Sequence, residues 1–225
     1  MDAEILGKTA LFQGIEPQEL DPMLQCLGAV RRAYAKGALI FCAGQVIETL
    51  GLVLSGGVNI ENDDPWGNKS ILGYAGPGQI FAESYACIPG QPLMVSAAAA
   101  EPCEILLLNV GRLLQPCGRG CACHTRLIRN LLAMTAQKNL NLSRRILHTA
   151  PKTIRGRLLS YLAFEAARQK SATVILPFDR QQLADYLSVD RSALSAELGR
   201  MRRDGLLEAQ KNRFTLLGPL PDSEL

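Results

Sequence analysis

The chain of 225 residues lacks any apolar run near the roughly 20 consecutive residues that a membrane-spanning helix needs. Its N-terminus carries Asp2 and Glu4 and has no basic region followed by an apolar core, so no secretory signal is visible. Hydrophobic residues make up 48% and charged residues 20%, a balance typical of globular rather than disordered proteins. The length suits two domains. We therefore expect a cytoplasmic, multidomain protein without a membrane partner.

Histidine is scarce, which bears on catalysis. The chain has two histidines, His124 and His148, and neither lies in a recognised catalytic motif. An enzyme needs a nucleophile with its base, or paired carboxylates, in a cleft. We therefore expect no catalytic residues and no enzymatic activity. A metal- or thiol-dependent enzyme built on the segment 117–124 is the remaining alternative of this kind.

The basic excess is small and unevenly placed. Residues 1–149 hold 12 Lys+Arg and 12 Asp+Glu, whereas residues 150–225 hold 12 and 9. The whole net charge of +3 therefore lies in the C-terminal part. A surplus of this size does not prove nucleic-acid binding, but its location agrees with it.

The segment 178–217 has the pattern of two short helices, a tight turn and a small hairpin. Asp179 is placed to cap the first helix, with Gln182 as its capping-box partner three residues later. One face of this helix is apolar and consists of Leu183, Ala184 and Leu187. The small Ala184 permits the close approach of two helices that a helix-turn-helix requires.

The second helix of this segment follows the turn at Ser188 and Val189. Asp190 is its expected cap, and Gly205 is placed to end it. Its apolar stripe, at the spacing of one buried face, is formed by Leu194, Leu198 and Met201. The pattern as a whole predicts a helix-turn-helix followed by a wing. A solvated basic helix in an ordinary helical hairpin is the alternative.

A DNA-binding helix places its first residues at base edges in the major groove and its basic residues at phosphates. Arg191 stands at the first helical position and is long enough to reach guanine O6 and N7. The predicted base-reading residues are Arg191, Ser192 and Ser195. The predicted phosphate contacts are Arg180, Arg200, Arg202, Lys211 and Arg213, for which ordinary surface charge is the alternative. The expected partner is double-stranded DNA.

The first half of the chain has a different texture. Pro17 begins a short helical pattern, and from Arg31 to Leu108 short apolar runs alternate with glycine-containing turns. The runs are Leu39–Phe41, Leu50–Leu54, Val58–Ile60, Ser70–Leu72 and Glu104–Leu108. Many short strands with such turns predict an antiparallel sandwich or barrel, which can enclose a small-molecule pocket.

The segment 121–148 contains neither proline nor glycine and predicts a long helix. A heptad-like seam runs through Ile128, Leu132, Thr135, Asn139, Leu142 and Ile146. A second apolar edge, formed by Leu127, Leu131 and Met134, is placed to pack on the β unit. Two edges need two partners, and we expect the seam to pair with a symmetry mate in a homodimer. Burial of the whole helix within one monomer is the alternative.

Taken together, these parts resemble the superfamily of the cyclic AMP receptor protein and the fumarate-nitrate regulator (CRP/FNR), which are bacterial transcription factors. The stretches that carry the resemblance are KGALIFCAGQ, LVLSGGV, GPGQIFAESYA and TIRGRLLSYLA, together with the helix-turn-helix. The resemblance implies an α+β fold with an N-terminal antiparallel β-roll (a double-stranded β-helix) and flanking helices, a long dimerisation helix and a C-terminal winged helix-turn-helix. The corresponding domains are 1–120, 121–149 and 150–225.

The same resemblance implies a homodimer that binds a palindromic promoter site and switches when an effector binds the β-roll. A contact with RNA polymerase is a further expectation for an activator, and no segment marks its surface. In this family the recognition helix frequently carries a second, downstream arginine, and Ala196 occupies that position here. Ala196 cannot donate a hydrogen bond, so the recognised DNA sequence cannot be carried over from the family.

The resemblance also permits a test of the effector. In cyclic-nucleotide-binding members a glutamate holds the ribose and an Arg-Ser pair follows, whose arginine holds the phosphate. Glu83 matches the glutamate, but Leu93 and Met94 occupy the Arg-Ser positions, and PLMVSAAAA contains no cation. A phosphate in a closed pocket favours a bidentate arginine, so the sequence argues against cyclic AMP. A structural carboxylate at a turn is the alternative role for Glu83.

We therefore expect a small-molecule effector other than cyclic AMP, or none. The predicted pocket is bounded by Glu83, Ser84, Leu93, Lys138, Leu142 and Ser143.

Seven cysteines allow a second hypothesis. Four of them, Cys26, Cys42, Cys87 and Cys103, are scattered among apolar neighbours and are expected to be buried free thiols. Cys117, Cys121, Cys123 and His124 are clustered and could bind a metal or act as a thiol redox switch. Their spacing matches no standard zinc or iron–sulfur pattern, so no resident metal or cluster is assigned. Incidental cysteines, redox sensing and metal sensing all stay open.

Overall fold

A computed structural model describes residues 6–63, 69–115 and 122–218. The chain divides into two compact units, residues 1–137 (the N-terminal unit) and 138–225 (the C-terminal unit). The boundary falls within a single long helix, α5 (Ala122–Thr149). The three-domain division expected from the sequence therefore stays a prediction, and each unit is described by itself.

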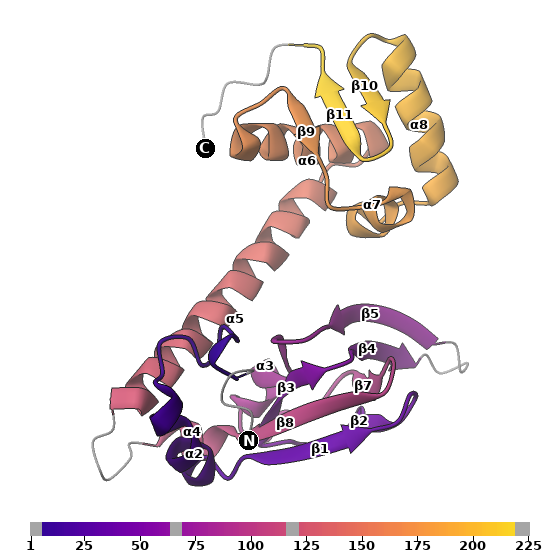
Figure 1. The fold of residues 1–225 in the computed structure, drawn as a ribbon. Coiled ribbons are helices and arrows are strands. Elements are labelled where there is room, and N and C mark those ends of the chain that lie inside the picture. Colours follow the sequence, from indigo (N-terminus) through magenta and orange to yellow (C-terminus); the bar gives the residue numbers. More distant parts are fainter. Residues whose placement is uncertain (1–5, 64–68, 116–121, 219–225) are drawn as a thin grey trace. The chain divides into compact units, whose positions relative to one another are not determined.

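Two antiparallel sheets form the centre of the N-terminal unit (Figure 1). One has the strand order β1-β8-β3-β6 and the other the order β2-β7-β4-β5. The strands are β1 (Val30–Tyr34), β2 (Leu39–Phe41), β3 (Thr49–Ser55), β4 (Val58–Asp63), β5 (Lys69–Ala75), β6 (Ile80–Phe81), β7 (Ser96–Ala99) and β8 (Cys103–Asn109). One core cluster draws side chains from both sheets, so the sheets pack face to face.

The sheet that contains β3 and β8 is covered on both faces. In β8, Ile105 points into the core between the two sheets, whereas Leu106 and Leu108 point into a second core on the opposite side. Alternate residues of a strand point to opposite faces, so a continuous apolar run such as this one suits a strand buried on both sides. The stretch Ile105–Leu108 is therefore an inner strand that is covered on both faces, whereas the Glu104 side chain is 40% exposed.

The second core is closed by helices. These are α2 (Pro17–Cys26), α4 (Val110–Leu114) and the first turns of α5, which lie beside one another at one end of the strands (Figure 1). Leu127 and Leu131 of α5 are 0% and 4% exposed in this core. The Asn130 amide also donates to the backbone carbonyls of Leu11 and Gln13, at 2.9 and 3.0 Å. The prediction that this edge of the helix packs on the β unit is confirmed.

The tight turn between β3 and β4 contains two glycines, of which Gly56 is the more constrained. Gly56 has φ of +71°, and a Cβ there would lie 2.4 Å from the carbonyl oxygen of Pro102. A Cβ on Gly57 would overlap the ring of Tyr74. The SGG sequence therefore fits the close approach of two loops and one aromatic ring.

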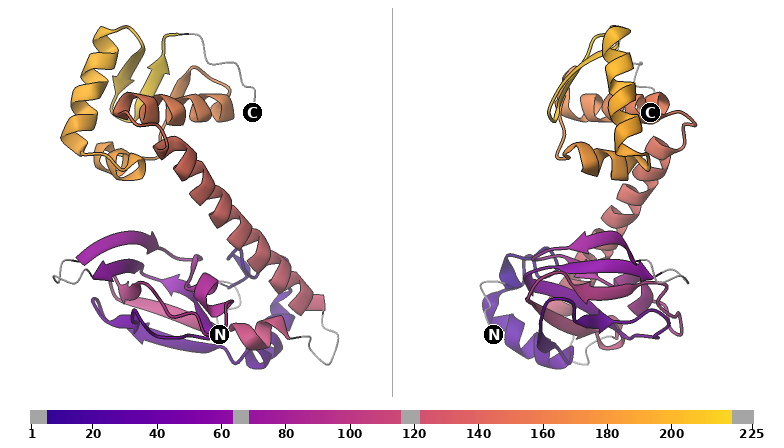
Figure 2. Two further views of the ribbon diagram at one scale, coloured as in Figure 1. Left: turned by 180° about the vertical axis from the view of Figure 1, so that it is seen from behind. Right: turned by 90° about the vertical axis from the view of Figure 1, so that its right-hand side faces the viewer.

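The C-terminal unit contains α6 (Ile154–Gln169), α7 (Arg180–Leu187) and α8 (Arg191–Arg203), with a small sheet of order β10-β11-β9. Its strands are β9 (Thr173–Ile175), β10 (Leu207–Gln210) and β11 (Arg213–Leu216). Figure 2 shows α8 along one side of this unit with β10 next to it. Side chains from the helices and the sheet meet in one core, which includes Leu162, Leu183, Leu194 and Phe214.

The sequence predicted helices at the positions of α2, α5, α7 and α8 and located the longer strands, but it missed the short helices α3 and α4 and several short strands. The helix expected from Cys121 to His148 is observed from Ala122 to Thr149, and residue 121 lies outside the described residues. β1 was missed because its residues are mostly exposed, β6 because it has two residues, and β7 because three of its four residues are alanines with little strand preference. In the described part of the chain, no helix combines the length and apolarity that a bilayer crossing requires.

Candidate nucleic-acid interface

The first helix of the predicted helix-turn-helix begins with the expected cap. The Asp179 carboxylate accepts a hydrogen bond from the Gln182 amide at 2.8 Å, and the Gln182 side-chain oxygen accepts one from the Asp179 amide at 2.9 Å. This reciprocal pair satisfies two backbone N–H groups at the start of α7. Ser188 ends the helix in the left-handed region, with φ of +53°. Cap and turn residues therefore define α7 locally.

The second helix, α8, begins at Asp190. The carboxylate of Asp190 accepts from the Ala193 amide at 2.8 Å and from the Ser192 hydroxyl. These hydrogen bonds, that from Ser192 first, lower the pKa of Asp190. At the other end of the helix Asp204 is the C-cap residue, and Gly205 follows it with φ of +68°. The predicted bounds of the recognition helix are confirmed.

Two arginines outside the motif hold the turn between α7 and α8. Arg145, near the end of α5, donates to the backbone carbonyls of residues 185–186 at 2.8 and 3.1 Å. Arg157, near the start of α6, donates to the carbonyls of residues 187–188 at 3.1 and 2.9 Å. The last carbonyls of a helix lack partners within it and favour cations. Neither arginine was predicted from the sequence, since only the fold brings them to this turn.

The recognition helix has one buried and one exposed side. Its apolar stripe is buried, with Leu194, Leu198 and Met201 at 0%, 5% and 0% exposure. The predicted base-reading residues Arg191, Ser192 and Ser195 are all exposed. Arg203, which was not predicted to contact DNA, shares the exposed side, because positions 192, 196, 199 and 203 follow the spacing of one helical face. That spacing was readable from the sequence.

Arg180 is more enclosed than the sequence suggested. Its guanidinium donates to the Lys211 carbonyl at 3.1 Å and lies over the Phe214 ring, 5.2 Å from the centroid. Burial lowers the pKa of Arg180, and its Nη1 has no hydrogen-bond partner among the described residues. The side chain therefore ties the start of α7 to the hairpin. Arg202, Lys211 and Arg213 are exposed, as expected of phosphate contacts.

Arg200, the remaining predicted phosphate contact, is ion-paired within the unit. Its Nε and Nη2 each lie 2.7 Å from Oε2 of Glu197. Glu197 is buried, at 7% exposure, and its other oxygen accepts from Arg155 of α6 at 2.7 Å. This network was not predicted from the sequence.

The predicted effector residues fall in both units. Glu83 and Leu93 belong to the N-terminal unit and are 4% and 5% exposed, whereas Ser84 is exposed. Lys138, Leu142 and Ser143 belong to the C-terminal unit. Lys138 and Leu142 are exposed there, as is Ser143. The pocket that was expected to combine the two sets stays a prediction.

The surroundings of Glu83 are poor in positive charge along the sequence. Glu83 opens the short helix α3 (Glu83–Ala86), which follows Ala82 in the left-handed region. The nearest cations along the chain are Lys69 and Arg112, with neither lysine nor arginine between them. Met94, at an Arg-Ser position of the family's cassette, is 73% exposed.

The structure describes only two of the four residues in the clustered metal or redox hypothesis. Cys117 and Cys121 lie outside the described residues. Cys123 is half-buried against the helix-covered core, and His124 is 5% exposed with neither ring nitrogen hydrogen-bonded to a described residue. Within the described ranges, no three His, Cys, Asp or Glu side chains are grouped to hold a metal ion.

The scattered cysteines do not all behave as expected. Cys103 is buried and burial raises the pKa of its thiol, with the charge of Glu101 adding to the effect. Cys26, in contrast, is exposed near the end of α2, so the expectation of a buried thiol is wrong there. Its position on the outer side of an amphipathic helix accounts for the difference, since Leu24 and Met23 fill the inner side.

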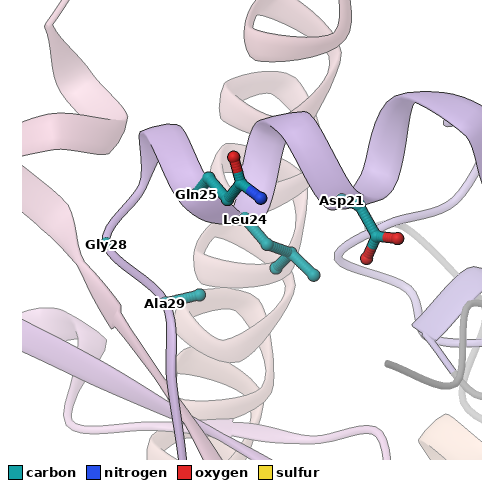
Figure 3. Close-up of a pocket in the computed structure, with 5 residues that line it drawn as sticks. All are labelled: Asp21, Leu24, Gln25, Gly28 and Ala29. Atoms are coloured by element: carbon teal, nitrogen blue, oxygen red, sulfur yellow. The ribbon is translucent and has the colours of Figure 1, made fainter.

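The N-terminal unit also has a surface pocket of about 270 Å³ between α2 and the loop that leads to β1 (Figure 3). Asp21, Leu24, Gln25, Gly28 and Ala29 line it. Asp21 is the only ionisable residue among these five, so the lining offers no paired acid and base. This pocket coincides with none of the predicted site residues.

The fold and the exposed recognition helix define the class of protein. A winged helix-turn-helix follows a double-sheet domain and a long helix, as in DNA-binding regulators with a sensory domain.

Comparison with known proteins identifies the family. The model of the cyclic nucleotide-binding domain matches residues 31–119, and that of the Crp-like helix-turn-helix domain matches residues 156–219. The cyclic AMP receptor protein of Thermus thermophilus is 30% identical over 192 residues, which cover 85% of this chain and 80% of that protein. A CRP-like cAMP-activated global transcriptional regulator of Mycobacterium tuberculosis is 23% identical, with 92% of each chain covered. The chain belongs to the CRP/FNR family of DNA-binding transcription regulators, which are not enzymes.

Solved structures agree on the fold. The structure described as OCPA complexed CprK has a TM-score of 0.64 and 17% sequence identity to this chain. The similarity covers 89% of this chain and 92% of that one. The predicted architecture of a β-roll, a long helix and a winged helix-turn-helix is thereby confirmed.

Proposed function

We propose that this regulator binds a palindromic DNA site as a homodimer, with α8 of each protomer in a major groove. The observation that carries the proposal is the two-sided character of α8. Leu194 and Met201 fix one side in the core at 0% exposure, while Arg191, Ser192 and Ser195 stand exposed in the first two turns. A major groove admits one helix, whose N-terminal residues meet base edges.

Arg191 is the proposed base-reading residue. We expect Arg191→Ala to weaken binding to the cognate site by roughly 1–3 kcal/mol, because a bidentate contact with guanine is lost. The cognate duplex is first selected from a randomised pool with the purified protein, and affinities are then measured for it and for a random duplex. Equal losses on both duplexes would contradict base reading by Arg191.

Arg202→Ala is the matched control, since Arg202 is an exposed arginine on the same helix. As a proposed phosphate contact, it should weaken binding to both duplexes alike and reduce the salt dependence of binding. Lys211 and Arg213 on the wing belong to the same proposed group, and Arg180 would join it only by leaving Phe214.

The homodimer rests on the exposed seam of α5. Leu132, Leu142 and Ile146 are 67%, 61% and 67% exposed, and they recur at heptad-like spacing. A second copy presents the same edge and can cover it by two-fold symmetry, which also matches a palindromic site. RNA polymerase is the further partner that an activator would need, and no described residue is assigned to it.

We also propose that the effector of the N-terminal unit is a small molecule other than cyclic AMP. Glu83 and Leu93 are buried, Leu93 takes the place of a phosphate-binding arginine, and the neighbouring strand β7 carries only serine and alanine. An anionic phosphate buried without a cation would be strongly disfavoured. The relatives named for cyclic AMP are therefore not a guide to this ligand.

Calorimetric titration with cyclic AMP tests this proposal, with DNA affinity measured in its presence and absence. We expect no micromolar binding and no change in DNA affinity. A thermal-shift screen of small metabolites then follows, because a ligand that binds the folded state raises its apparent stability. Micromolar binding of cyclic AMP would refute the proposal, and a screen without any shift would favour an effector-independent DNA-binding dimer.

A further inference from the structure

Glu197 lies at the centre of an ionic bridge between α6 and α8. Its Oε1 accepts from Nε of Arg155, and its Oε2 accepts from Nε of Arg200, both at 2.7 Å. Nη2 of Arg155 also lies 2.7 Å from Oδ2 of Asp204 at the end of α8. The hydrogen bond from Arg155, with a smaller contribution from Arg200, lowers the pKa of Glu197. The carboxylate is therefore ionised at neutral pH.

A second buried glutamate in the same unit forms its ion pair within a single helix and serves as a comparison. Glu165 of α6 is 6% exposed, and Arg168, three residues later, donates to it from Nε and Nη2 at distances from 2.6 to 3.2 Å. Gln169 completes the set at 2.9 Å from the same carboxylate. All three residues belong to one helix. The ion pair of this glutamate therefore lies within one helix, and only the Gln169 amide reaches a second element, through hydrogen bonds of 3.1 and 3.2 Å with the backbone of Ile175 in β9.

The Glu197 bridge differs by reaching the predicted DNA surface. Arg200 is 56% exposed, yet two of its nitrogens face the carboxylate, so its charge is partly neutralised and its direction is fixed. A DNA phosphate that approaches Arg200 at an arbitrary position must compete with that carboxylate. A phosphate at a position set by α8 in the groove can use the remaining N–H groups without breaking the pair, because a guanidinium carries five donors.

We propose that Glu197 is a specificity-determining positioning residue: it restrains Arg200 so that this arginine contributes little to binding of random DNA. Arg155 of α6 binds Glu197 and thereby holds α8 against α6. The inference rests on the proposed placement of α8 in the major groove. It concerns the ratio of cognate to random affinity, a quantity that a merely structural glutamate would not change.

The test compares Glu197→Gln with the wild type on the selected cognate duplex and on a random duplex of equal length, over a series of salt concentrations. Release of Arg200 adds about one phosphate contact to random binding. We expect the affinity for random DNA to rise roughly threefold to tenfold, and the slope of log affinity against log salt to steepen by about 0.9. Affinity for the cognate duplex should change less, so the specificity ratio falls.

Glu165→Gln is the matched control, because it removes an equally buried carboxylate with the same i, i+3 arginine. It should leave both affinities and both salt slopes unchanged. In the double variant Glu197→Gln with Arg200→Gln, the gain on random DNA should disappear. A gain that persists without Arg200, or that appears equally in Glu165→Gln, would assign the effect to net charge alone and overturn the proposal.

Arg155→Gln gives a second route if Glu197→Gln does not fold, because it leaves Glu197 paired with Arg200. It should weaken binding to the cognate duplex and leave random binding unchanged, since α8 is then no longer tied to α6. Unchanged affinity for both duplexes in folded variants would overturn the role of the bridge. Failure of the wild-type protein to select any duplex would instead refute the proposed function.

Discussion

The two ends of α5 carry the same kind of side chain in opposite surroundings. Near the N-terminal end, Leu127 and Leu131 are 0% and 4% exposed in the core beneath β3 and β8. Near the C-terminal end, Leu142 and Ile146 are 61% and 67% exposed. A residue's hydrophobicity alone therefore does not say what it packs against. The buried leucines are explained within the chain, whereas the exposed ones, which include Leu132 at 67% beside Leu131, call for a partner outside it.

The largest effect is expected at the exposed end. Leu142→Ala removes one leucine from each copy of the proposed dimer seam, and burial of such a side chain contributes roughly 1.5–3 kcal/mol. The two copies together should raise the dimer dissociation constant by about a hundredfold or more. Sedimentation equilibrium measures this constant, and Leu140→Ala, at an exposed leucine outside the heptad seam, is the control. An unchanged dissociation constant would remove α5 from the interface.

The next effect is expected at the buried end. Leu131→Ala should lower the free energy of unfolding of the N-terminal unit by roughly 2–5 kcal/mol, because it leaves a cavity in a closed core. Urea denaturation followed by circular dichroism measures the loss. At low protein concentration, where the monomer prevails, Leu142→Ala should lower the free energy of unfolding far less than Leu131→Ala does. Equal losses of unfolding free energy in the two variants would contradict the difference in burial between these leucines.

The smallest effect concerns the histidine at the C-terminal end. His148 is 3% exposed, and its Nδ1 lies 2.9 Å from the hydroxyl of Tyr186 on α7. Burial lowers the pKa of His148; Glu165 raises it in part and Arg144 lowers it further. The unfolded chain therefore binds a proton near pH 6.5 that the folded chain takes up only at lower pH.

In the window below about pH 6.5, the unfolded state binds more protons than the folded state, so stability falls as the pH falls and is fully present above that window. Unfolding of the wild type and of His148→Gln is measured between about pH 5 and pH 8. The stability difference between the two should shrink toward acidic pH. A difference that stays constant with pH would show that His148 does not titrate in this way.

The helix-turn-helix could be predicted in detail because its signals are local. Each capping residue lies within a few residues of the backbone groups that it satisfies or ends. The examples are the capping box of Asp179 and Gln182, the cap at Asp190 and the glycine after Asp204. The same holds for the apolar stripe of α8. Sequence spacing is then a sufficient guide, because neighbours in sequence are neighbours in space.

The ionic contacts that hold this motif could not be predicted in that way. Arg145 and Arg157 reach the turn between α7 and α8 from 30 to 41 residues away in sequence, and Arg155 lies 42 residues from Glu197. Short strands such as β7 also escaped, since their alanines lack the β-branched pattern of a strand. Pairings of this length depend on chain topology, which single-residue patterns do not encode.

The sequence by itself determined the order of parts, the caps and apolar faces of the helices, and the lack of lysine and arginine between Lys69 and Arg112. These properties follow from residue type and spacing. The tertiary structure decided which edge of α5 is buried, which arginines are held within the unit, and that Arg200 pairs with a buried glutamate. The physical reason is that burial and ion pairing arise between segments far apart in the chain, and only the folded backbone sets those distances.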